Sequence, residues 1–190
     1  LGYSSPKTPS RVYLYNLANK SKKLINEQEI PSGHNPDDYI VERIEYKSHD
    51  GRLVPLTITR HKKTKINGSA NLLLYGYGSY GHSMSPNFSS TKLSLIERDI
   101  IWATAHIRGG MEKGMRWWKE GKLTNKKNTF EDYIYAAKYL IEKKYSSKGK
   151  IIGMGGSAGG LLMGAVVNQS PELFLGIIMA VPFVDSLTTN

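Results

Sequence analysis

The chain has 190 residues, of which 39% are hydrophobic and 22% charged, and its formal net charge is +10 at pH 7. This composition is typical of a folded globular protein and excludes a disordered or fibrous one. The longest apolar stretches are far shorter than the roughly 20 residues that span a bilayer, so we predict no membrane segment. The lysines are spread over polar turns without interleaved aromatic side chains, so we expect no nucleic-acid partner.

The beginning of the chain is rich in proline, serine and glycine and lacks the apolar centre of a signal peptide. Its first residue is Leu1, which fits a processed chain, a truncated chain or a fragment. Cysteine is absent, so disulfides and thiolate metal sites are excluded. A reducing, cytoplasmic location fits this composition best.

The first elements in the chain are predicted to be β-strands. Residues 11–17 alternate apolar and polar side chains, and a turn separates them from residues 23–26, which predicts a hairpin. Residues 30–38 contain two prolines and a glycine and read as a linker, with a domain boundary near residue 35. A second hairpin is expected from the alternating residues 39–46 and 53–60, which flank an Asp-Gly turn.

The pattern then changes to that of an α/β protein. Short continuous apolar runs predict strands that are buried on both faces, as in a parallel sheet. Asn128 followed by Glu131 resembles a capping box at the start of an amphipathic helix. We therefore predict a doubly wound α/β sheet, with strands over 70–75, 100–105, 150–154 and 176–181 and helices over 128–141 and 158–169.

A glycine-rich turn lies between a predicted strand and a predicted helix. Its residues Gly155-Gly156-Ser157-Ala158-Gly159 match the G-x-S-x-G pattern of a nucleophile on a sharp strand-to-helix turn. Such a turn needs small residues where strand and helix pass close to the serine. It also exposes the Ala158 N–H at a helix N-terminus, where it can stabilise an oxyanion. The alternatives are an ordinary tight turn and a dinucleotide-binding loop, but no acidic residue ends the strand that follows.

Two further loops are expected at the carboxyl edge of the same sheet, where ligands bind in such folds. The loop after residue 75 reads Gly76-Tyr77-Gly78-Ser79-Tyr80-Gly81 and lies where α/β-hydrolases place their second oxyanion donor. The Tyr77 hydroxyl is the candidate donor, and the alternative is that Tyr77 is an aromatic wedge. Residues 108–112 form the third loop.

The base that would activate this serine is missing from the expected place. In this fold the order along the chain is serine, acid, histidine, but all five histidines precede Ser157. His106 reads as a histidine at a loop edge, and Asp185 reads more readily as a loop or cap residue than as the acid. Because removal of the base can cost a serine protease about a million-fold in turnover, we expect this chain alone to be nearly inert.

Several of these segments together resemble the prolyl oligopeptidase family of serine peptidases. Ala158 after the serine favours its oligopeptidase B branch, and Met111 stands where the family has a third glycine. The segments that carry the resemblance are Val-Tyr-Leu-Tyr-Asn-Leu at 12–17, Tyr-Gly-Tyr-Gly-Ser-Tyr-Gly at 75–81, Ile-Arg-Gly-Gly at 107–110, Lys-Asn-Thr-Phe-Glu-Asp-Tyr at 127–133, Gly-Gly-Ser-Ala-Gly-Gly-Leu-Leu-Met-Gly at 155–164 and Val-Pro-Phe-Val-Asp at 181–185.

The resemblance implies a β-propeller that caps an α/β-hydrolase domain. Residues 1–35 would be the last piece of the propeller and residues 36–190 the first part of the hydrolase domain. It implies cleavage of short peptides after Lys or Arg, without metal or cofactor. Ser157 would be the nucleophile, Tyr77 an oxyanion donor, and Tyr80 part of the pocket for the residue before the scissile bond.

The same resemblance puts the acid, the histidine and the carboxylates that read basic side chains beyond residue 190. A complementary C-terminal half is therefore the expected partner besides short peptides. The open alternatives are an inactive split or decayed remnant and a hydrolase of the carboxylesterase or lipase type.

Overall fold

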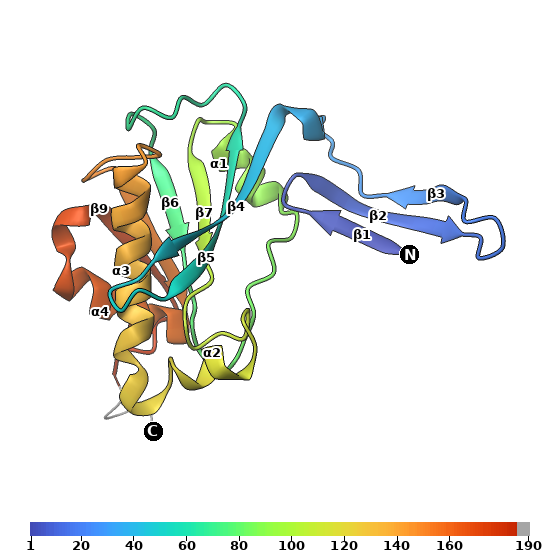
Figure 1. Ribbon diagram of the computed structural model, residues 1–190. Coiled ribbons are helices and arrows are strands. Elements are labelled where there is room, and N and C mark those ends of the chain that lie inside the picture. Colours follow the sequence, from blue (N-terminus) through green and yellow to red (C-terminus); the bar gives the residue numbers. More distant parts are fainter. Residues whose placement is uncertain (186–190) are drawn as a thin grey trace.

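The computed structural model describes residues 1–185, which form two separate β-sheets (Figure 1). The first sheet has three antiparallel strands and stands out to one side: β1 Gly2–Ser5, β2 Thr8–Tyr15 and β3 Lys22–Glu27. The predicted hairpin is confirmed as β2 and β3, and β1 extends it by a strand that the sequence pattern did not indicate. A division of the chain near residue 35 stays a prediction.

The second sheet has six strands in the order β4-β5-β7-β6-β8-β9. Strands β4 and β5 form the second predicted hairpin and are antiparallel, whereas β7, β6, β8 and β9 run parallel to one another. The bounds are β4 Tyr39–Lys47, β5 Leu53–His61, β6 Leu72–Tyr75, β7 Ile101–Ala105, β8 Ile151–Gly156 and β9 Phe174–Ala180. The parallel half of the sheet therefore has one carboxyl edge, at which the three predicted loops meet.

Helices cover both faces of the six-stranded sheet. Buried side chains of α3 and α4 pack on one face, and those of α1 pack on the other. This arrangement confirms the predicted doubly wound α/β fold. The helices are η1 Pro36–Asp38, α1 Ser90–Ile96, α2 Met115–Lys119, η2 Leu123–Asn125, α3 Lys127–Glu142, α4 Ala158–Gln169 and η3 Pro171–Leu173. None of the helices in residues 1–185 has the length and apolar character needed to cross a membrane.

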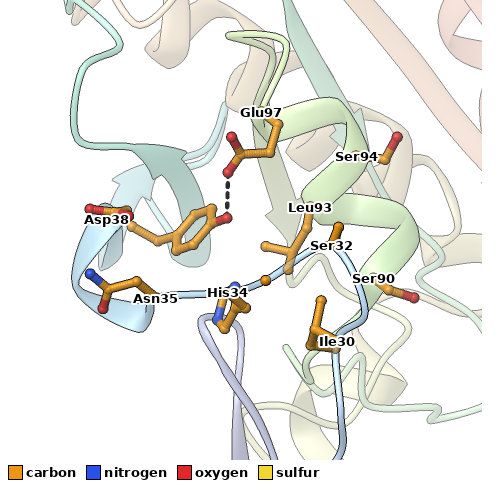
Figure 2. A pocket seen from close by; sticks show the side chains of 11 residues that line it. Ile30, Ser32, His34, Asn35, Asp38, Ser90, Leu93, Ser94 and Glu97 are labelled. Atoms are coloured by element: carbon orange, nitrogen blue, oxygen red, sulfur yellow. Dashed lines mark hydrogen bonds between the residues drawn. The ribbon is translucent and has the colours of Figure 1, made fainter.

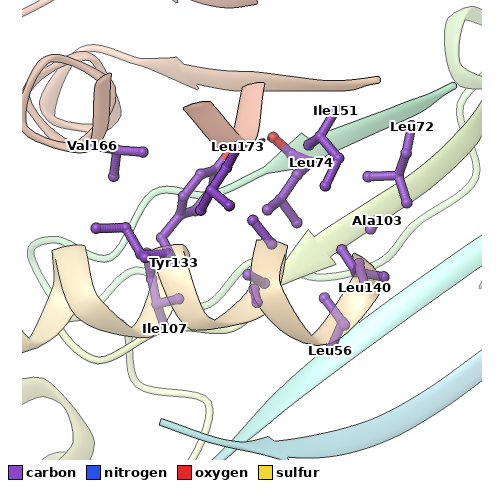
Figure 3. Close-up of a cluster of buried hydrophobic side chains, with 14 of the residues drawn as sticks. Leu56, Leu72, Leu74, Ala103, Ile107, Tyr133, Leu140, Ile151, Val166 and Leu173 are labelled. Atoms are coloured by element: carbon purple, nitrogen blue, oxygen red, sulfur yellow. Dashed lines mark hydrogen bonds between the residues drawn. The ribbon is translucent and has the colours of Figure 1, made fainter. Parts of the chain in front are cut away.

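The larger core lies between the sheet and α3 (Figure 3). Successive residues of β6 point to opposite faces, so Leu72 and Leu74 reach this core while Leu73 packs with Trp102 in the core beneath α1. Tyr133 is fully buried among these side chains, and its hydroxyl donates a hydrogen bond to the Leu74 carbonyl oxygen at 2.5 Å. The phenol thus fills apolar space and pairs its one polar atom.

The predicted capping box at the start of α3 is wrong. Helix α3 begins at Lys127, and no side chain caps it. Asn128 instead donates from Nδ2 to the Glu120 carbonyl oxygen at 2.9 Å. The reason is that η2 runs almost directly into α3, so the residue before the helix already has helical backbone angles and no extended capping residue precedes it.

A buried ion cluster, which we call the Arg108 cluster, joins three distant parts of the chain. Arg108 is 1% exposed, and its Nη2 lies 2.6 Å from Oδ1 of the fully buried Asp132 in α3. The Arg108 Nη1 pairs with Asp50 Oδ2 at 2.6 Å, and the Ser48 hydroxyl donates to Asp132 Oδ1 at 2.6 Å. Because Ser48 and Asp50 both lie in the turn between β4 and β5, the cluster joins that turn and α3 to the loop after β7.

Substitution of Asp132 by Asn should leave a buried guanidinium without its main counter-charge. Loss of one partner of a buried ion pair costs about 3–5 kcal/mol, so we expect the free energy of unfolding to fall by about 3 kcal/mol. Urea unfolding followed by circular dichroism measures this change. The neighbouring Glu131→Gln is the matched control and should stay within about 0.5 kcal/mol of the parent chain. Equal midpoints for the two variants would contradict a stabilising cluster.

Candidate active site

Ser157 occupies a strained turn between β8 and α4. Its backbone angles are φ 53° and ψ −118°, a conformation that residues with a side chain rarely adopt. The backbone around it holds this shape: Ser157 N–H donates to the Ala180 carbonyl oxygen at 2.9 Å, and Phe183 N–H donates to the Ser157 carbonyl oxygen at 3.0 Å. Such strain costs about 1–3 kcal/mol and persists where the surroundings enforce it. The turn leaves Ser157 exposed at the carboxyl edge of the sheet.

Glycines permit this turn because strand and helix backbones nearly touch there. A Cβ atom at Gly155 would lie 2.2 Å from the carbonyl oxygen of Gly159. At Gly160 it would lie 2.4 Å from Cα of Pro182, in the segment that follows β9. The expected need for small residues on both sides of Ser157 is thus confirmed by the geometry.

The two expected oxyanion donors both lie at the first turn of α4. Ala158 is the first helical residue, so its N–H has no acceptor within the helix. The Tyr77 ring lies against the same turn, since a Cβ at Gly159 would be 3.4 Å from Tyr77 Cδ2. The ring also packs edge-on against His82, with centroids 5.7 Å apart. Within residues 1–185 the Tyr77 hydroxyl makes no hydrogen bond, so its role as a donor stays a prediction.

Tyr80 lies at a cavity next to the serine turn. This cavity of about 350 Å³ is lined by Tyr80 and Ala158 together with Trp118 and Phe183. Tyr80 is 79% exposed and has a positive φ of 56°, the second strained residue at this edge. The structure therefore brings Tyr80 and Ala158 to one cavity. A role for Tyr80 in binding the residue before the scissile bond stays a prediction.

Sequence reasoning missed Lys126, which holds the loop between Tyr77 and Tyr80. Its ammonium donates to the Gly78 carbonyl oxygen at 2.6 Å and to the Ser79 hydroxyl at 2.8 Å. Burial lowers the pKa of Lys126 to about 8. Lys126 and Lys127 are adjacent, and such a pair usually lies on a solvent-exposed surface. The sequence therefore holds no local signal that Lys126 is half-buried and Lys127 exposed.

The loop at 108–112 packs directly on the loop that carries Tyr77. Gly109 has a φ of 97°, and a Cβ there would lie 2.0 Å from the Gly78 carbonyl oxygen. Met111 does not have a positive φ, so its backbone tolerates a side chain where the family has glycine. Glu112 folds back beneath this loop and accepts a hydrogen bond from Met84 N–H at 2.9 Å.

No histidine within residues 1–185 contacts the Ser157 hydroxyl. His106 is 1% exposed, so it is a core residue rather than a residue of the loop edge. Its Nε2 lies 2.8 Å from Thr57 Oγ1 and 3.1 Å from Arg43 Nη1, which turns the ring toward β4 and β5. Asp185 is exposed at the end of the described chain, and its role as the acid stays a prediction. No group of three His, Asp or Glu side chains within this range could hold a metal ion.

A second, larger cavity of about 620 Å³ lies on the linker side of the protein (Figure 2). It opens between residues 30–39 and helix α1, where the Tyr39 hydroxyl donates to Glu97 and the His34 ring stacks on Tyr39. None of the predicted site residues lines it. The smaller cavity beside Ser157 is therefore the one that belongs to the candidate active site.

The serine turn should not accept even one added methyl group at Gly155. Gly155→Ala forces a Cβ into the Gly159 backbone, and overpacking of this kind costs about 1–3 kcal/mol. We expect urea unfolding to show a loss in the upper part of that range. Gly176→Ala, in the next strand, is the matched control because a Cβ there meets nothing within 4 Å, and its unfolding should be nearly unchanged. The prediction fails if Gly155→Ala unfolds like Gly176→Ala.

Comparison with known proteins gives consistent matches over almost the whole chain. It is 45% identical over 188 residues to Dipeptidyl aminopeptidase BI of Pseudoxanthomonas mexicana, covering 98% of this chain and 26% of that protein. It is 42% identical to Protease 2 of Moraxella lacunata, covering 98% of this chain and 27% of that protein. The chain thus spans about a quarter of the length of these relatives.

Solved structures agree with this match. The structure of oligopeptidase B from Leishmania major superimposes with a TM-score of 0.90 at 40% identity, over 97% of this chain and 26% of that one. Oligopeptidase B from Trypanosoma brucei gives a TM-score of 0.90 at 36% identity over the same shares of the two chains. The model of the prolyl oligopeptidase family itself matches residues 86–190, which include the serine turn and all of α3 and α4. On this match the chain belongs to the prolyl oligopeptidase family of serine peptidases.

Proposed function

We propose that Ser157 is the nucleophile of a peptide-cleaving acyl transfer. The observation that carries this proposal is the strained, exposed turn, which presents Ser157 beside an unpaired helix N-terminus and the Tyr77 ring. Strain of this kind is concentrated at functional sites. A purely structural serine does not require a turn that excludes a Cβ at both Gly155 and Gly160.

In the proposed reaction Ser157 Oγ attacks the carbonyl carbon of the scissile peptide bond. Its proton passes to a histidine supplied from outside residues 1–190, and that histidine then protonates the leaving amine. The Ala158 N–H and the Tyr77 hydroxyl donate to the oxyanion that forms in the tetrahedral intermediate. Water then hydrolyses the acyl-enzyme.

The proposed substrates are short peptides cut after Lys or Arg by the longer protein. The support is the resemblance to the oligopeptidase B branch and the similarity to two proteins that carry that name. A basic side chain needs carboxylates for recognition. The residues that line the cavity beside Ala158 include no Asp or Glu, so these carboxylates must come from elsewhere. A cytoplasmic location rests only on the absence of cysteine.

A complementary C-terminal half is the proposed protein partner. Within residues 1–185, β9 pairs on one side only, with β8. Several large apolar side chains on and after β9 are exposed, namely Leu175, Ile178, Met179, Val181 and Val184. An open strand edge with exposed apolar side chains favours pairing with a further strand.

Labelling with a fluorophosphonate probe tests the role of Ser157. The chain alone should label slowly, because no base contacts Ser157, and a mixture with a chain carrying the downstream half should label quickly and hydrolyse an Arg-ending fluorogenic peptide. Ser157→Ala should abolish both signals. Hydrolysis of simple esters without peptide turnover would identify an esterase instead. Absence of labelling in the mixture would support an inactive remnant and contradict the proposal.

Tyr77→Phe tests the second oxyanion donor in the same mixture. Loss of one such donor costs about 10²–10³-fold in kcat, so the substitution should lower kcat by that factor with little change in KM. Phe keeps the ring that packs against His82, and therefore an aromatic wedge alone would predict an unchanged kcat. Tyr75→Phe is the matched control, because Tyr75 packs against Trp102 in the core beneath α1.

A further inference from the structure

The side chain of Glu112 is buried beside the candidate active site, although the proposed reaction does not use it. This side chain is only 7% exposed. Its Oε1 accepts the Met84 N–H at 2.9 Å, whereas its buried Oε2 has no hydrogen-bond partner within residues 1–185. Buried polar atoms without a partner are rare because they cost free energy. The burial of Glu112 therefore needs an explanation beyond packing.

The ring of His106 orients this carboxylate. The His106 Nε2 lies 3.1 Å from Arg43 Nη1, and a guanidinium can only donate, so Nε2 accepts and the ring proton lies on Nδ1. This Nδ1 faces Glu112 Oε1 at 3.6 Å, beyond ordinary hydrogen-bond length but close enough for electrostatic attraction. Burial raises the pKa of Glu112, but His106 and the Met84 N–H more than offset it, so the pKa is lowered. Glu112 is therefore an ionised acceptor at pH 7.

The missing side chain at Gly110 makes room for this carboxylate. A Cβ atom at Gly110 would lie 2.1 Å from Glu112 Oε2. The loop at 108–112 thus folds over its own carboxylate, which points toward the segment that follows Tyr80. Glycine at this position is explained by the place of Glu112.

Residues 81–84, which we call the linking segment, connect Glu112 to Tyr77. The Gly81 N–H donates to the Gly109 carbonyl oxygen at 2.9 Å, and the Met84 N–H donates to Glu112. Between these two bonds lies His82, whose ring packs edge-on against the Tyr77 ring with centroids 5.7 Å apart. Since the Tyr77 hydroxyl makes no hydrogen bond within residues 1–185, contacts of the ring decide where that hydroxyl points.

We propose that Glu112 and His82 are positioning residues for the Tyr77 hydroxyl. Glu112 holds the linking segment, and His82 in that segment holds the Tyr77 ring against the first turn of α4. This inference rests on the proposed function, in which Tyr77 donates to the oxyanion. Such a donor acts only when it is placed at hydrogen-bond distance from the developing charge, and a misplacement of about 1 Å can cost about 10²-fold in rate.

Nuclear magnetic resonance of the chain alone tests this positioning without any turnover. The readout is the nuclear Overhauser effect between the Tyr77 ring protons and the Cα protons of Gly159, which lie against each other in the structure. Glu112→Ala and His82→Ala should each lose most of this effect. Glu112→Ala should also speed the amide exchange of Met84 by about tenfold, which corresponds to one hydrogen bond to a charged group.

Conservative variants and a matched control separate positioning from a general loss of structure. Glu112→Gln keeps an oxygen for the Met84 N–H, and His82→Phe keeps the ring, so both should retain the Overhauser effect. Glu45→Ala is the control, because it removes a carboxylate that pairs at 2.9 Å with Lys113, the next residue of the chain, and it should change neither readout. Circular dichroism identifies a misfolded variant, and His82→Ala, at an exposed position, then decides.

Turnover in the mixture with the downstream half tests the consequence for catalysis. Glu112→Ala and His82→Ala should each lower kcat by about tenfold or more with little change in KM. Neither substitution should lower kcat further in a Tyr77→Phe chain, because no hydroxyl is left to position. A merely structural role predicts equal losses with and without that hydroxyl.

An unchanged Overhauser effect in both alanine variants would overturn the proposal. Equal losses of kcat in the two Tyr77 backgrounds, or a Glu45→Ala chain that behaves like Glu112→Ala, would overturn it as well. Failure of the proposed function gives a different result: the parent mixture would show no turnover, and the Overhauser effect of the chain alone would still decide whether Glu112 and His82 place the Tyr77 ring.

Discussion

The candidate site depends on one buried cation, Arg108, in the loop that follows β7. Its guanidinium is fully enclosed and must be neutralised where it lies, since an unpaired buried charge costs several kcal/mol. Asp132 and Asp50 can do so only if α3 and the β4–β5 turn are both brought to this point. The backbone N–H of Arg108 also donates to Asp132 Oδ2 at 3.0 Å, which fixes the chain itself and not only its side chain. The start of the 108–112 loop is thereby held from two sides, by α3 and by the β4–β5 turn.

From this fixed point the loops of the site are positioned by contact between backbones. Gly109 follows Arg108 and presses on Gly78, the residue after Tyr77, while Gly81 N–H donates to the Gly109 carbonyl oxygen at 2.9 Å. Gly159 in turn lies against the carbonyl oxygen of Gly76. Glycine is required at Gly109 and Gly78, because a Cβ would lie 2.0 Å from the Gly78 carbonyl oxygen in the first case and 2.4 Å from Thr129 Cγ2 in the second. The position of Tyr77 relative to the serine turn thus follows from the Arg108 cluster through a short chain of packed peptide units.

The sequence predicted the long, strongly patterned elements well and the non-local contacts poorly. Strands β4 and β5 and helices α3 and α4 have clear periodicity and were placed within a few residues of their observed bounds. Helices α1 and α2 have only 7 and 5 residues, too few to show a period, and were missed. The predicted capping box was wrong because η2 continues almost directly into α3, so no extended residue precedes the helix to cap it. Of the site, Ser157 and its glycines could be read from one local pattern, whereas Lys126 acts on a loop 47 residues earlier in the chain.

Recognition and proton transfer depend on different parts of this protein. The Ser157 turn is held entirely by groups within the described chain, through the Ala180 carbonyl oxygen, Phe183 N–H and the close approach of Pro182. The same is true of the loops that carry Tyr77 and Tyr80, because Lys126 and Gly109 restrain them. The backbone shape of the Ser157 turn does not depend on the catalytic base, because backbone hydrogen bonds and packing fix both the serine and the helix N-terminus. The geometry of the serine turn can therefore be complete where the proton acceptor is not. The position of Ser157 beside the Ala158 N–H is thus a property of the folded chain, and it can be tested separately from acyl transfer.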